Sequence, residues 1–377
     1  MEQIKKLLFF VTEDWYFCSH RLPLALAAKE AGYEVIVVTR VQSHGDRIKA
    51  AGLKLIPFEL SRRGMNPLTE LGVISRLASI YKVERPDIVH HVALKPVLYG
   101  SIASRLSRIP YVVNAMAGLG FIFSSKTLKA RITRPFFLMF FKLLLNSSGS
   151  RVILQNADDA TLLSNSGVLN DKRIALIRGS GVDTLEYTPH PEPDGEPLVI
   201  LASRLLWDKG VGEFVDAARL LKEDGIHARF ALVGEGDSEN PGSISDEQLQ
   251  IWHDEGVIEL WGKKDNMPNV FAQSHIVCLP SFYGEGVPKV LIEAASCGKP
   301  IVTTDAPGCR DIVRDGVNGI LVPLRNSTAV AEALKKLIES PGLRKEMGKK
   351  GRELVEREFS LHQVNRETLA LYEELLH

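Results

Sequence analysis

The sequence predicts an α/β protein with two doubly wound parallel sheets, one in each half of its 377 residues. Three observations lead to this fold class. The chain is longer than one ordinary hydrophobic core supports, which indicates two domains. Short, wholly apolar runs alternate with helix-like stretches, as in parallel strands joined by crossover helices. The alternation stops over residues 178–197, where Pro, Gly and acidic residues gather, and then resumes.

The first half opens on an apolar run that is too short for the core of a signal peptide and fits a buried strand. Helix-like stretches include residues 21–32, 69–86 and 99–107, and Gly32, Gly52 and Pro110 mark ends or turns between elements. The predicted strands of this half cover residues 7–11, 34–40, 53–58, 87–92, 110–116 and 150–157.

The second half repeats the pattern, with helix-like stretches at residues 212–224 and 289–298. Its predicted strands cover residues 198–203, 228–236, 257–262, 275–281, 300–305 and 319–323. We expect an N-terminal domain at 1–182, a linker at 183–197, a C-terminal domain at 198–360 and a final amphipathic helix at 361–377. Two tandem domains of this kind place a cleft between the carboxyl ends of their sheets, where ligands bind.

Charge is distributed unevenly although the formal net charge is +0. Residues 88–157 contain no Asp or Glu, whereas they carry Lys95, Arg105, Arg108, Lys126, Lys129, Arg131, Arg134, Lys142 and Arg151. Such a field favours anionic ligands, phosphates or an anionic membrane surface. The 4 cysteines are scattered without a CxxC motif, which indicates reduced thiols in a cytoplasmic protein rather than disulfides or a zinc site.

The stretch "GEGVPKVLIEA" at residues 284–294 places two carboxylates in an apolar setting. Pro288 suits the first turn of a helix that ends near Gly298, and the free N–H groups of that turn form an anion site. Glu285 precedes the helix, and Glu293 lies about two turns further on. Carboxylates accept hydrogen bonds from vicinal hydroxyl groups, so both indicate a polyhydroxyl ligand. A capping acid followed by a solvated Glu is the alternative, which the apolar flanks disfavour.

Two further motifs follow predicted strands. "SRLLWDKG" at residues 203–210 lies between a strand and a helix, where Arg204 and Lys209 would converge on a phosphate. "LVGEGD" at residues 232–237 is a glycine-rich strand end that contains Gly234 and Gly236. Taken alone, each motif is also typical of a solvated loop or a simple turn.

Together these residues resemble the retaining family-4 glycosyltransferases with the GT-B fold. The likeness rests on Arg204, Lys209, the 234–236 loop and the E-x7-E spacing from Glu285 to Glu293, and it extends over essentially the whole chain. It includes "GSGVD" and the final helix, which in that family crosses back to the first domain. In the N-terminal half, "SRRGMNP", "DIVHHVALKPVLYG" and "GLGFIF" resemble the subgroup that extends lipid-linked glycans for bacterial surface polysaccharides or glycoproteins.

The resemblance implies a role for each donor-site residue. Arg204 and Lys209 would hold the donor diphosphate, Glu285 the sugar hydroxyls and Glu293 the ribose hydroxyls, while the backbone near Lys263 would meet the base. The sugar and phosphate would face Gly286, Val287, Pro288, Lys289 and Val290. Such enzymes use no active-site metal, and no Asp-x-Asp motif would serve one here. Two cationic side chains and a helix N-terminus can stabilise a departing diphosphate instead.

The N-terminal half departs from the family pattern in two places. The Gly-Gly loop that often follows the first strand is replaced by "TEDWYFCSHRLP", so His20 and Arg21 would take over diphosphate or acceptor contacts. Many relatives have His-x-His after the fourth strand, whereas this chain has His90 and His91 side by side. His91 would reach the donor sugar, or the pair would be buried and internally hydrogen-bonded. Lipid-linked acceptor diphosphate would meet Arg62, Arg63 or Lys95.

The implied reaction is transfer of a hexose or N-acetylhexosamine from a UDP-linked donor to a polyprenyl-diphosphate-linked glycan, with retention and without a cofactor. A nucleotide-sugar epimerase of the same twin-domain fold and a non-catalytic sugar-nucleotide binding protein are alternatives. A phosphorylase would need a pyridoxal lysine, which nothing singles out. A dinucleotide oxidoreductase is disfavoured because no GxGxxG follows the first strand, and no feature indicates a nucleic-acid partner.

The stretch "SSKTLKARITRPFFLMFFKLLL" at residues 124–145 mixes basic and apolar residues. Its most apolar run is well short of the roughly 20 residues that span a bilayer. A core helix with a basic first turn is one interpretation. The other is a patch that docks on the inner face of the cytoplasmic membrane, with lysines and arginines on anionic headgroups. The second interpretation predicts a cytoplasmic, peripherally membrane-bound protein.

Overall fold

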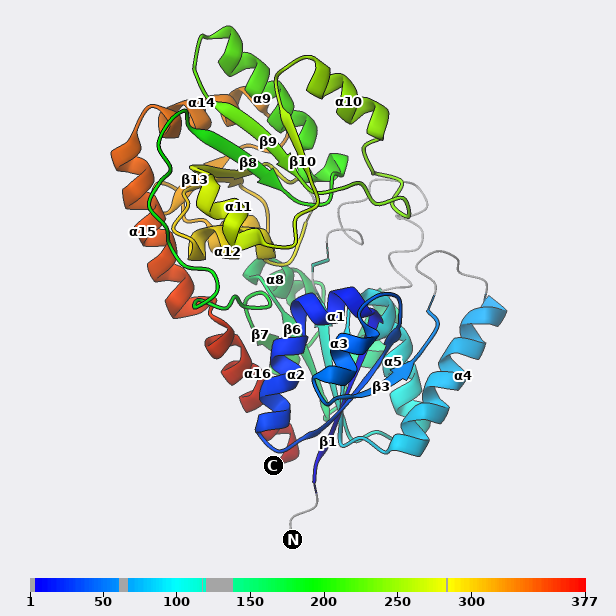
Figure 1. Cartoon of the computed structure of the whole chain (residues 1–377). Coiled ribbons are helices and arrows are strands. Elements are labelled where there is room, and N and C mark those ends of the chain that lie inside the picture. The colour runs from blue at the N-terminus through cyan, green and yellow to red at the C-terminus, as the bar shows by residue number, and fades with distance from the viewer. Residues whose placement is uncertain (1–3, 61–66, 117, 120–137, 283) are drawn as a thin grey trace. The chain divides into compact units, whose positions relative to one another are not determined.

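A computed structural model of the chain describes residues 4–60, 67–116, 118–119, 138–282 and 284–377 (Figure 1). The chain divides into unit 1, which comprises Met1–Ser180 and Leu361–His377, and unit 2, which comprises Gly181–Ser360. Each unit is built on its own parallel sheet, of 7 strands in unit 1 and 6 in unit 2. The predicted α/β class with two doubly wound sheets is therefore confirmed.

The sheet of unit 1 has the strand order β3-β2-β1-β4-β5-β6-β7. Its strands are β1 (Lys6–Glu13), β2 (Glu34–Arg40), β3 (Lys54–Pro57), β4 (Ile88–Val92), β5 (Tyr111–Met116), β6 (Ser150–Leu154) and β7 (Ile174–Leu176). The named helical segments are α1 (Asp14–His20), α2 (Leu22–Glu30), α3 (Gly45–Ala50), α4 (Pro67–Glu84), α5 (Leu94–Ser107), α8 (Ala157–Asn165), the short η1 (Asp171–Arg173) and α16 (Leu361–Leu376). Residues 138–145 are also helical.

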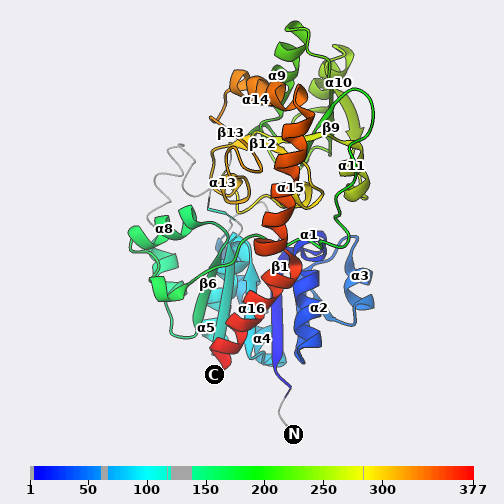
Figure 2. The same ribbon diagram turned by 90° about the vertical axis from the view of Figure 1, so that its left-hand side faces the viewer.

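The two faces of this sheet bury different residues because side chains alternate along each strand. Leu7 and Phe9 of β1 belong to a core that also contains residues of α2 and α16, whereas Leu8 and Phe10 pack with α4 and α5. Figures 1 and 2 show α16 running beside α2 at the surface of unit 1. The final helix thus completes the core of the unit that the chain began with.

The sheet of unit 2 has the order β10-β9-β8-β11-β12-β13. Its strands are β8 (Leu198–Ala202), β9 (Arg229–Val233), β10 (Glu259–Gly262), β11 (Ile276–Leu279), β12 (Ile301–Thr304) and β13 (Gly319–Val322). Its helices are η2 (Trp207–Lys209), α9 (Val211–Glu223), α10 (Asp246–Asp254), α11 (Met267–Gln273), α12 (Lys289–Ser296), α13 (Cys309–Ile312), α14 (Ser327–Ile338) and α15 (Pro341–Glu358). One continuous hydrophobic core joins them.

Every strand predicted from the sequence is present in the structure, with ends that differ by a few residues. The predicted elements do not include β7 or several helices, among them α1, α8, α10, α11, α14 and α15. β7 has only 3 residues and little burial, so it lacks the apolar run that marks the other strands. α1 follows β1 without a break, and the aromatic and polar residues of its sequence resemble a loop.

Candidate functional site in unit 2

Three loops of unit 2 carry the predicted donor-binding residues, and they leave neighbouring strands. Arg204 and Lys209 follow β8, Gly234 and Gly236 follow β9, and Glu285 follows β11. β8 pairs with β9 on one side and with β11 on the other, all in parallel. The carboxyl ends of parallel strands meet at one edge of a sheet, so the fold brings these loops together.

Two glycines allow the loops to approach closely. Gly210 has φ 75°, and a Cβ there would lie 2.1 Å from the carbonyl oxygen of Pro280. Gly234 has φ 144°, and its Cβ would lie 1.8 Å from the carbonyl oxygen of Ser203. Any other residue would meet backbone atoms at both positions, in a conformation that L-residues disfavour. These glycines therefore hold the loop after β8 against the loops after β9 and β11.

Among the described residues of this region, Lys209 and Glu285 form the ion pair with the shortest distance. The Lys209 Nζ lies 2.5 Å from Glu285 Oε2, and the two side chains are 12% and 17% exposed. The Ser281 hydroxyl donates to the other carboxylate oxygen of Glu285 at 3.0 Å. The carboxylate is thus held by two partners from two loops, in a largely buried place where charge interactions are strong.

Arg204 pairs with an acid that the sequence did not single out. Its Nη1 lies 2.7 Å from Asp237 Oδ2, with the two side chains 45% and 14% exposed. Asp237 sits in the loop after β9, where its backbone N–H is bonded to Ser243 Oγ at 2.9 Å. Arg204 is the more exposed partner, so its guanidinium remains accessible to an anion.

Glu293 lies near the middle of α12 and is buried, as its apolar flanks predict. Lys289 Nζ lies 3.2 Å from Glu293 Oε1, one helical turn away. Burial raises the pKa of the Glu293 carboxyl, while Lys289 and a hydrogen bond with Tyr187 act in the opposite direction. Tyr187 lies half-buried beside this carboxylate, and its partial burial together with Glu293 raises the pKa of that phenol.

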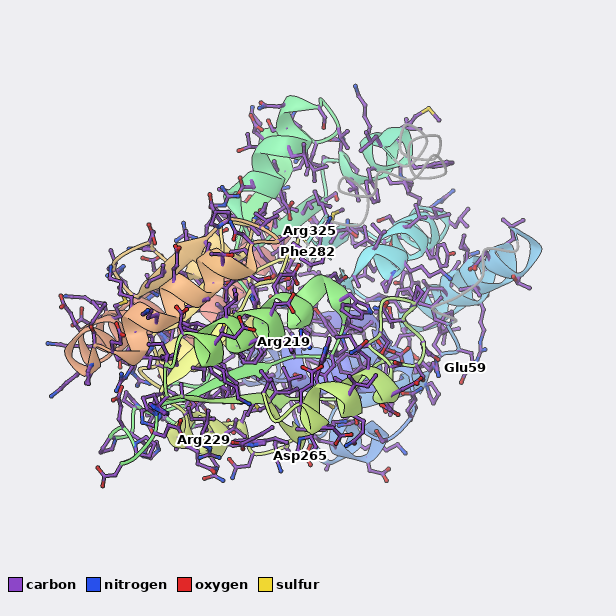
Figure 3. All side chains as sticks on the ribbon, turned by 90° about the horizontal axis from the view of Figure 1, so that it is seen from above. Glu59, Arg219, Arg229, Asp265, Phe282 and Arg325 are labelled. Atoms are coloured by element: carbon purple, nitrogen blue, oxygen red, sulfur yellow. The ribbon has the colours of Figure 1, made fainter. Side chains whose placement is uncertain are left out.

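The segment before α12 reaches the same loops. Pro288 is the N-cap of α12 rather than a residue of its first turn, and its carbonyl accepts the N–H of Leu291 at 3.1 Å. The guanidinium of Arg325 stacks over the ring of Phe282 at 4.3 Å (Figure 3). Gly286, Val287 and Val290 complete the predicted set around this helix start. Lys263 lies after β10 and pairs with Glu235 at 3.1 Å on the surface.

Predicted site residues of unit 1

His20 and Arg21 lie at the end of α1, just before α2. The His20 ring stacks on Tyr16 with centroids 4.2 Å apart. Arg21 is only 5% exposed, and its Nε has no hydrogen-bond partner in the described part of the chain. A buried guanidinium N–H without an acceptor is costly unless a ligand or water supplies one. Arg21 is therefore the strongest anion-binding candidate that the structure offers among the predicted residues of unit 1.

The histidine pair of β4 lies inside the unit 1 core, where both rings are fully buried. His91 contacts the Tyr81 hydroxyl at 3.0 Å through Nε2 and Asn114 Oδ1 at 2.8 Å through Nδ1. Burial lowers the pKa of His91 to about 4, so its ring is neutral at pH 7. Since both nitrogens are engaged, the geometry favours the packed-histidine alternative over the predicted contact of His91 with a donor sugar.

His90 joins the final helix to the sheet. Its Nδ1 lies 2.5 Å from the hydroxyl of Tyr372 on α16, and its ring stacks on Phe9. Burial lowers the pKa of His90 well below its ordinary value, with Arg21 as a further cause. His90 is thus a contact between β4 and α16.

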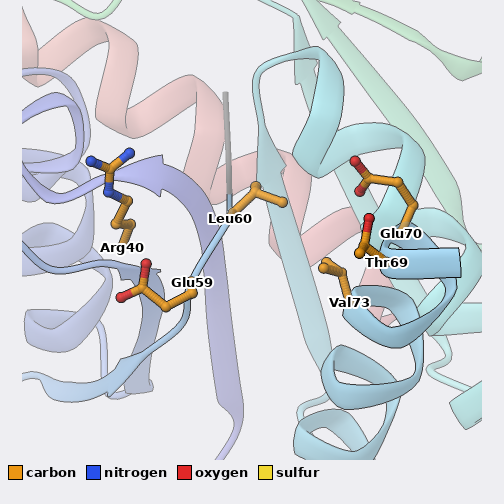
Figure 4. A pocket seen from close by; sticks show the side chains of 6 residues that line it. All are labelled: Arg40, Glu59, Leu60, Thr69, Glu70 and Val73. Carbon is orange, nitrogen blue, oxygen red and sulfur yellow. The ribbon is translucent and has the colours of Figure 1, made fainter. Parts of the chain in front are cut away.

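Lys95 lies at the start of α5, where its ammonium pairs with Glu70 at 3.2 Å and stands over the Tyr99 ring at 5.6 Å. Glu70 also lines a cavity of about 340 Å³ (Figure 4). The cavity lies between the ends of β2 and β3 and the first turns of α4, and its lining combines two carboxylates, a guanidinium and a hydroxyl with apolar residues: Arg40, Glu59, Leu60, Thr69, Glu70 and Val73. Arg62 and Arg63 lie outside the described residues, as do Lys126, Lys129, Arg131 and Arg134.

Sequence reasoning missed the groups that position the predicted side chains. Ser281 bonds to the predicted Glu285 within one loop, while Asp237 and Tyr187 bond to Arg204 and Glu293 from other segments of the chain. Ser281 and Asp237 lie in the same loops as Glu285 and Gly236, so their nearness in sequence to predicted site residues could have singled them out. Tyr187 lies in the segment interpreted as a linker, and nothing in its neighbours marks it. Over the described residues, no group of three or more His, Cys, Asp or Glu is arranged to hold a metal ion.

Comparison with known proteins places these observations in a family. The model of glycosyl transferases group 1 matches residues 185–354, and the model described as glycosyl transferase 4-like matches residues 6–156. A similar protein is the N,N'-diacetylbacillosaminyl-diphospho-undecaprenol alpha-1,3-N-acetylgalactosaminyltransferase of Campylobacter jejuni, 29% identical over 342 residues, which are 87% of this chain and 88% of the relative.

An Escherichia coli relative, UDP-Gal:alpha-D-GlcNAc-diphosphoundecaprenol alpha-1,3-galactosyltransferase, is 24% identical over 293 residues, which are 74% of this chain and 73% of the relative. Among solved structures, HepE of Anabaena in complex with UDP-glucose matches with a TM-score of 0.80 at 19% identity, over 98% of this chain and 99% of that chain. At that identity the likeness concerns the fold. No described helix of the chain is long and apolar enough to cross a membrane.

Proposed function

We propose that this chain, which belongs to the group 1 glycosyltransferases, moves a hexose or N-acetylhexosamine from a UDP-linked donor to a lipid-linked glycan. The observation that carries the donor half of the proposal is the meeting of Arg204, Lys209 and Glu285 at one edge of the unit 2 sheet. The acceptor class is supported by two relatives whose names describe transfer to undecaprenol-diphosphate-linked sugars. Bacterial surface polysaccharide or glycoprotein glycan synthesis is the corresponding process.

Donor binding would exchange the partners of the two cations. In the structure, Lys209 is held by Glu285 and Arg204 by Asp237. A diphosphate presents oxygens to both cations at once and so replaces the carboxylates as their partner. Glu285, released from Lys209, would then accept hydrogen bonds from vicinal sugar hydroxyls, while Glu293 would accept those of the ribose.

The chemistry follows from this arrangement. The bond from the anomeric carbon to the phosphate oxygen breaks as an acceptor hydroxyl approaches on the same face, so the anomeric configuration is retained. The departing phosphate oxygen takes the acceptor proton. Arg204 and Lys209 stabilise the charge that develops on the diphosphate, which is the task that other enzymes give to a divalent cation. We therefore expect transfer to continue in excess chelator, and an activity that needs added magnesium would contradict this part of the proposal.

The acceptor diphosphate would bind unit 1 through Arg21. Its guanidinium is nearly buried and its Nε has no partner in the described residues, so an acceptor phosphate would satisfy it. His20 lies next to it, and Lys95, Arg62 and Arg63 would extend the basic surface along a lipid-linked chain. Replacing Arg21 by Gln should raise the KM for the acceptor while leaving UDP affinity unchanged.

A direct test screens UDP-glucose, UDP-galactose, UDP-N-acetylglucosamine and UDP-N-acetylgalactosamine by thermal stabilisation. Each donor that stabilises the protein is then incubated with synthetic polyprenyl-diphosphate-linked sugars, and products are identified by mass spectrometry and by anomeric NMR couplings. Glu285→Gln should abolish transfer, whereas Asp216→Asn on the exposed side of α9 should not. Conversion of free nucleotide sugar without acceptor would indicate an epimerase, and binding without turnover a non-catalytic protein.

We also propose that the chain docks on the inner face of the cytoplasmic membrane through residues 124–145. The described helical end supports this: Met139, Phe140 and Leu143 are 51%, 46% and 59% exposed, while Phe141 and Leu145 are buried. One side of this helix therefore packs into the core of unit 1, while the other exposes apolar side chains that an interfacial segment would insert at the headgroup level. Vesicles containing anionic lipid should bind the protein at low salt. Charge reversal at Lys126, Lys129, Arg131 and Arg134 should abolish that binding, and undiminished binding would assign docking elsewhere.

A further inference from the structure

We propose that Asp208 is a positioning residue of the donor site whose carboxylate takes up a proton when a nucleotide diphosphate binds. The inference rests on the donor site proposed above and adds to it a residue for which neither the sequence motifs nor the comparisons suggest a role. Asp208 lies in the short η2 segment between β8 and α9, directly before Lys209.

The backbone of Asp208 is held in place by the loop that carries Glu285. Its carbonyl accepts the N–H of Phe282 at 3.1 Å, and the Ser281 hydroxyl, 3.2 Å away, shares its single proton between this carbonyl and Glu285. The backbone that carries this side chain is therefore fixed against the loop after β11. Its Oδ1 atom is buried and has no hydrogen-bond partner among the described residues. A buried carboxylate oxygen without a donor is strongly disfavoured in its charged form.

Charges around this oxygen are unbalanced. The Lys209 ammonium is committed to Glu285, and Arg204 is committed to Asp237. In the described part of these loops, the carboxylates of Asp208, Glu285 and Asp237 thus surround two cations, Lys209 and Arg204. A bound diphosphate adds further negative charge next to the same cations. Adding a proton to Asp208 removes one negative charge and converts its carboxylate into an O–H donor for a phosphate oxygen or for Glu285.

In the protein without a donor, the surroundings of Asp208 already favour its protonated form. Burial raises the pKa of Asp208, Glu285 raises it further, and the neighbouring Lys209 and Arg204 lower it. A diphosphate that engages these two cations cancels the part of their field that keeps Asp208 ionised. Binding therefore raises the pKa of Asp208 again. It follows that nucleotide affinity increases as the pH falls through the range between the free and bound pKa values.

Calorimetric titration of the full chain with UDP tests the proposal. Titrations in two buffers of different ionisation enthalpy at one pH count the protons taken up on binding. The wild type should take up more protons per UDP than Asp208→Asn, and titration of UDP itself cancels because the ligand is the same. If binding raises the pKa by one unit, Asp208→Asn binds UDP about tenfold more tightly than the wild type at a pH well above both pKa values. That difference should shrink as the pH is lowered towards the pKa of Asp208 in the UDP-free protein.

Asp216→Asn is the matched control, since it removes one exposed α9 carboxylate that pairs with Arg219 at 2.7 Å. It should behave as the wild type at every pH. Equal proton uptake by the wild type and Asp208→Asn, or an affinity ratio that does not change with pH, would overturn the inference while leaving the donor site intact. If the wild type does not bind UDP, the proposed UDP-linked donor is wrong, and this inference is then wrong as well.

Infrared difference spectra of the wild type alone give a second measurement, which does not depend on a variant that folds. Adding UDP should produce the carbonyl band of a newly protonated carboxyl group. A purely structural Asp208 would produce no such band, and its absence at every pH of a titration series would refute proton uptake.

Discussion

The ion pair between Lys209 and Glu285 should couple strongly in stability as well as in catalysis. Removing either side chain leaves the other charge in a place where only 12% of Lys209 and 17% of Glu285 is exposed. Without Lys209, Glu285 would keep its hydrogen bond from Ser281 at 3.0 Å. That bond reduces, but does not remove, the free-energy cost of leaving its charge unpaired. We therefore expect Lys209→Ala and Glu285→Ala each to lower the free energy of unfolding, and the double variant to lose less than the sum.

The magnitude follows from the burial of the pair. Breaking a fully buried pair by removing one partner costs about 3–5 kcal/mol. Here water still reaches part of both side chains, so we expect about 2 kcal/mol for each single variant. Contacting residues couple by about 0.5–3 kcal/mol, and the short Nζ–Oε2 distance of 2.5 Å places this pair in the upper part of that range. The expected coupling energy is about 2 kcal/mol.

Urea denaturation followed by tryptophan fluorescence provides the measurement. Unit 2 contains Trp207, Trp252 and Trp261, whereas unit 1 contains Trp15, so the signal mainly reports unit 2. A matched cycle uses Glu259 and Arg229, of which Arg229 is labelled in Figure 3. The two form a pair at 2.7 Å whose Arg229 and Glu259 side chains are 48% and 37% exposed.

Exposed pairs contribute about 0.2–1 kcal/mol, so the control cycle should show weak coupling. Coupling between Lys209 and Glu285 no larger than in the control would refute the reasoning from burial. Saturating UDP should reduce the Lys209–Glu285 coupling, because the diphosphate takes Lys209. Coupling that UDP leaves unchanged would mean that the nucleotide does not reach this lysine.

Three further predictions concern other contacts. Arg204→Ala and Lys209→Ala should each weaken UDP binding by roughly tenfold to a hundredfold, as loss of a hydrogen bond to a charged group does, and the double variant should lose less than the product; unchanged calorimetric affinities would remove both from the site. Burial raises the pKa of Glu293, so its ionisation destabilises the fold as the pH rises above its unfolded value of about 4.3; Glu293→Gln should gain stability relative to wild type between pH 4.5 and pH 8 in urea melts, and a constant difference would contradict this. Tyr372→Phe removes the bond to His90 and should cost about 1–2 kcal/mol while speeding hydrogen exchange in α16; unaltered exchange would show that the bond does not secure this helix.

Much of the fold was predictable because the information is local. A parallel strand covered on both faces needs an unbroken apolar run, and that run is visible in the sequence wherever it has enough residues. β7 was not predicted because it has only 3 residues and they are at most partly buried. The burial of Glu293 was predictable for the same reason, since its flanks on α12 are apolar on the side that faces the core.

The order of the motifs along the chain also implied that their loops share one edge of a sheet, because parallel strands all point their carboxyl ends the same way. Sequence therefore sufficed for the fold class, for the loops that carry Arg204, Lys209 and Glu285, and for the family resemblance. These properties depend on periodicity and on residue order, which tertiary packing does not change.

Tertiary structure alone decided which side chains meet. Arg204 pairs with Asp237 across 33 residues of sequence, and His90 bonds to Tyr372 across 282. In the folded protein both nitrogens of His91 contact Tyr81 and Asn114. Asp208 Oδ1 has no hydrogen-bond partner in the described part of the chain. Such contacts depend on distances of a few tenths of an ångström between segments that only folding brings together, and residue type and spacing along the chain carry no record of them.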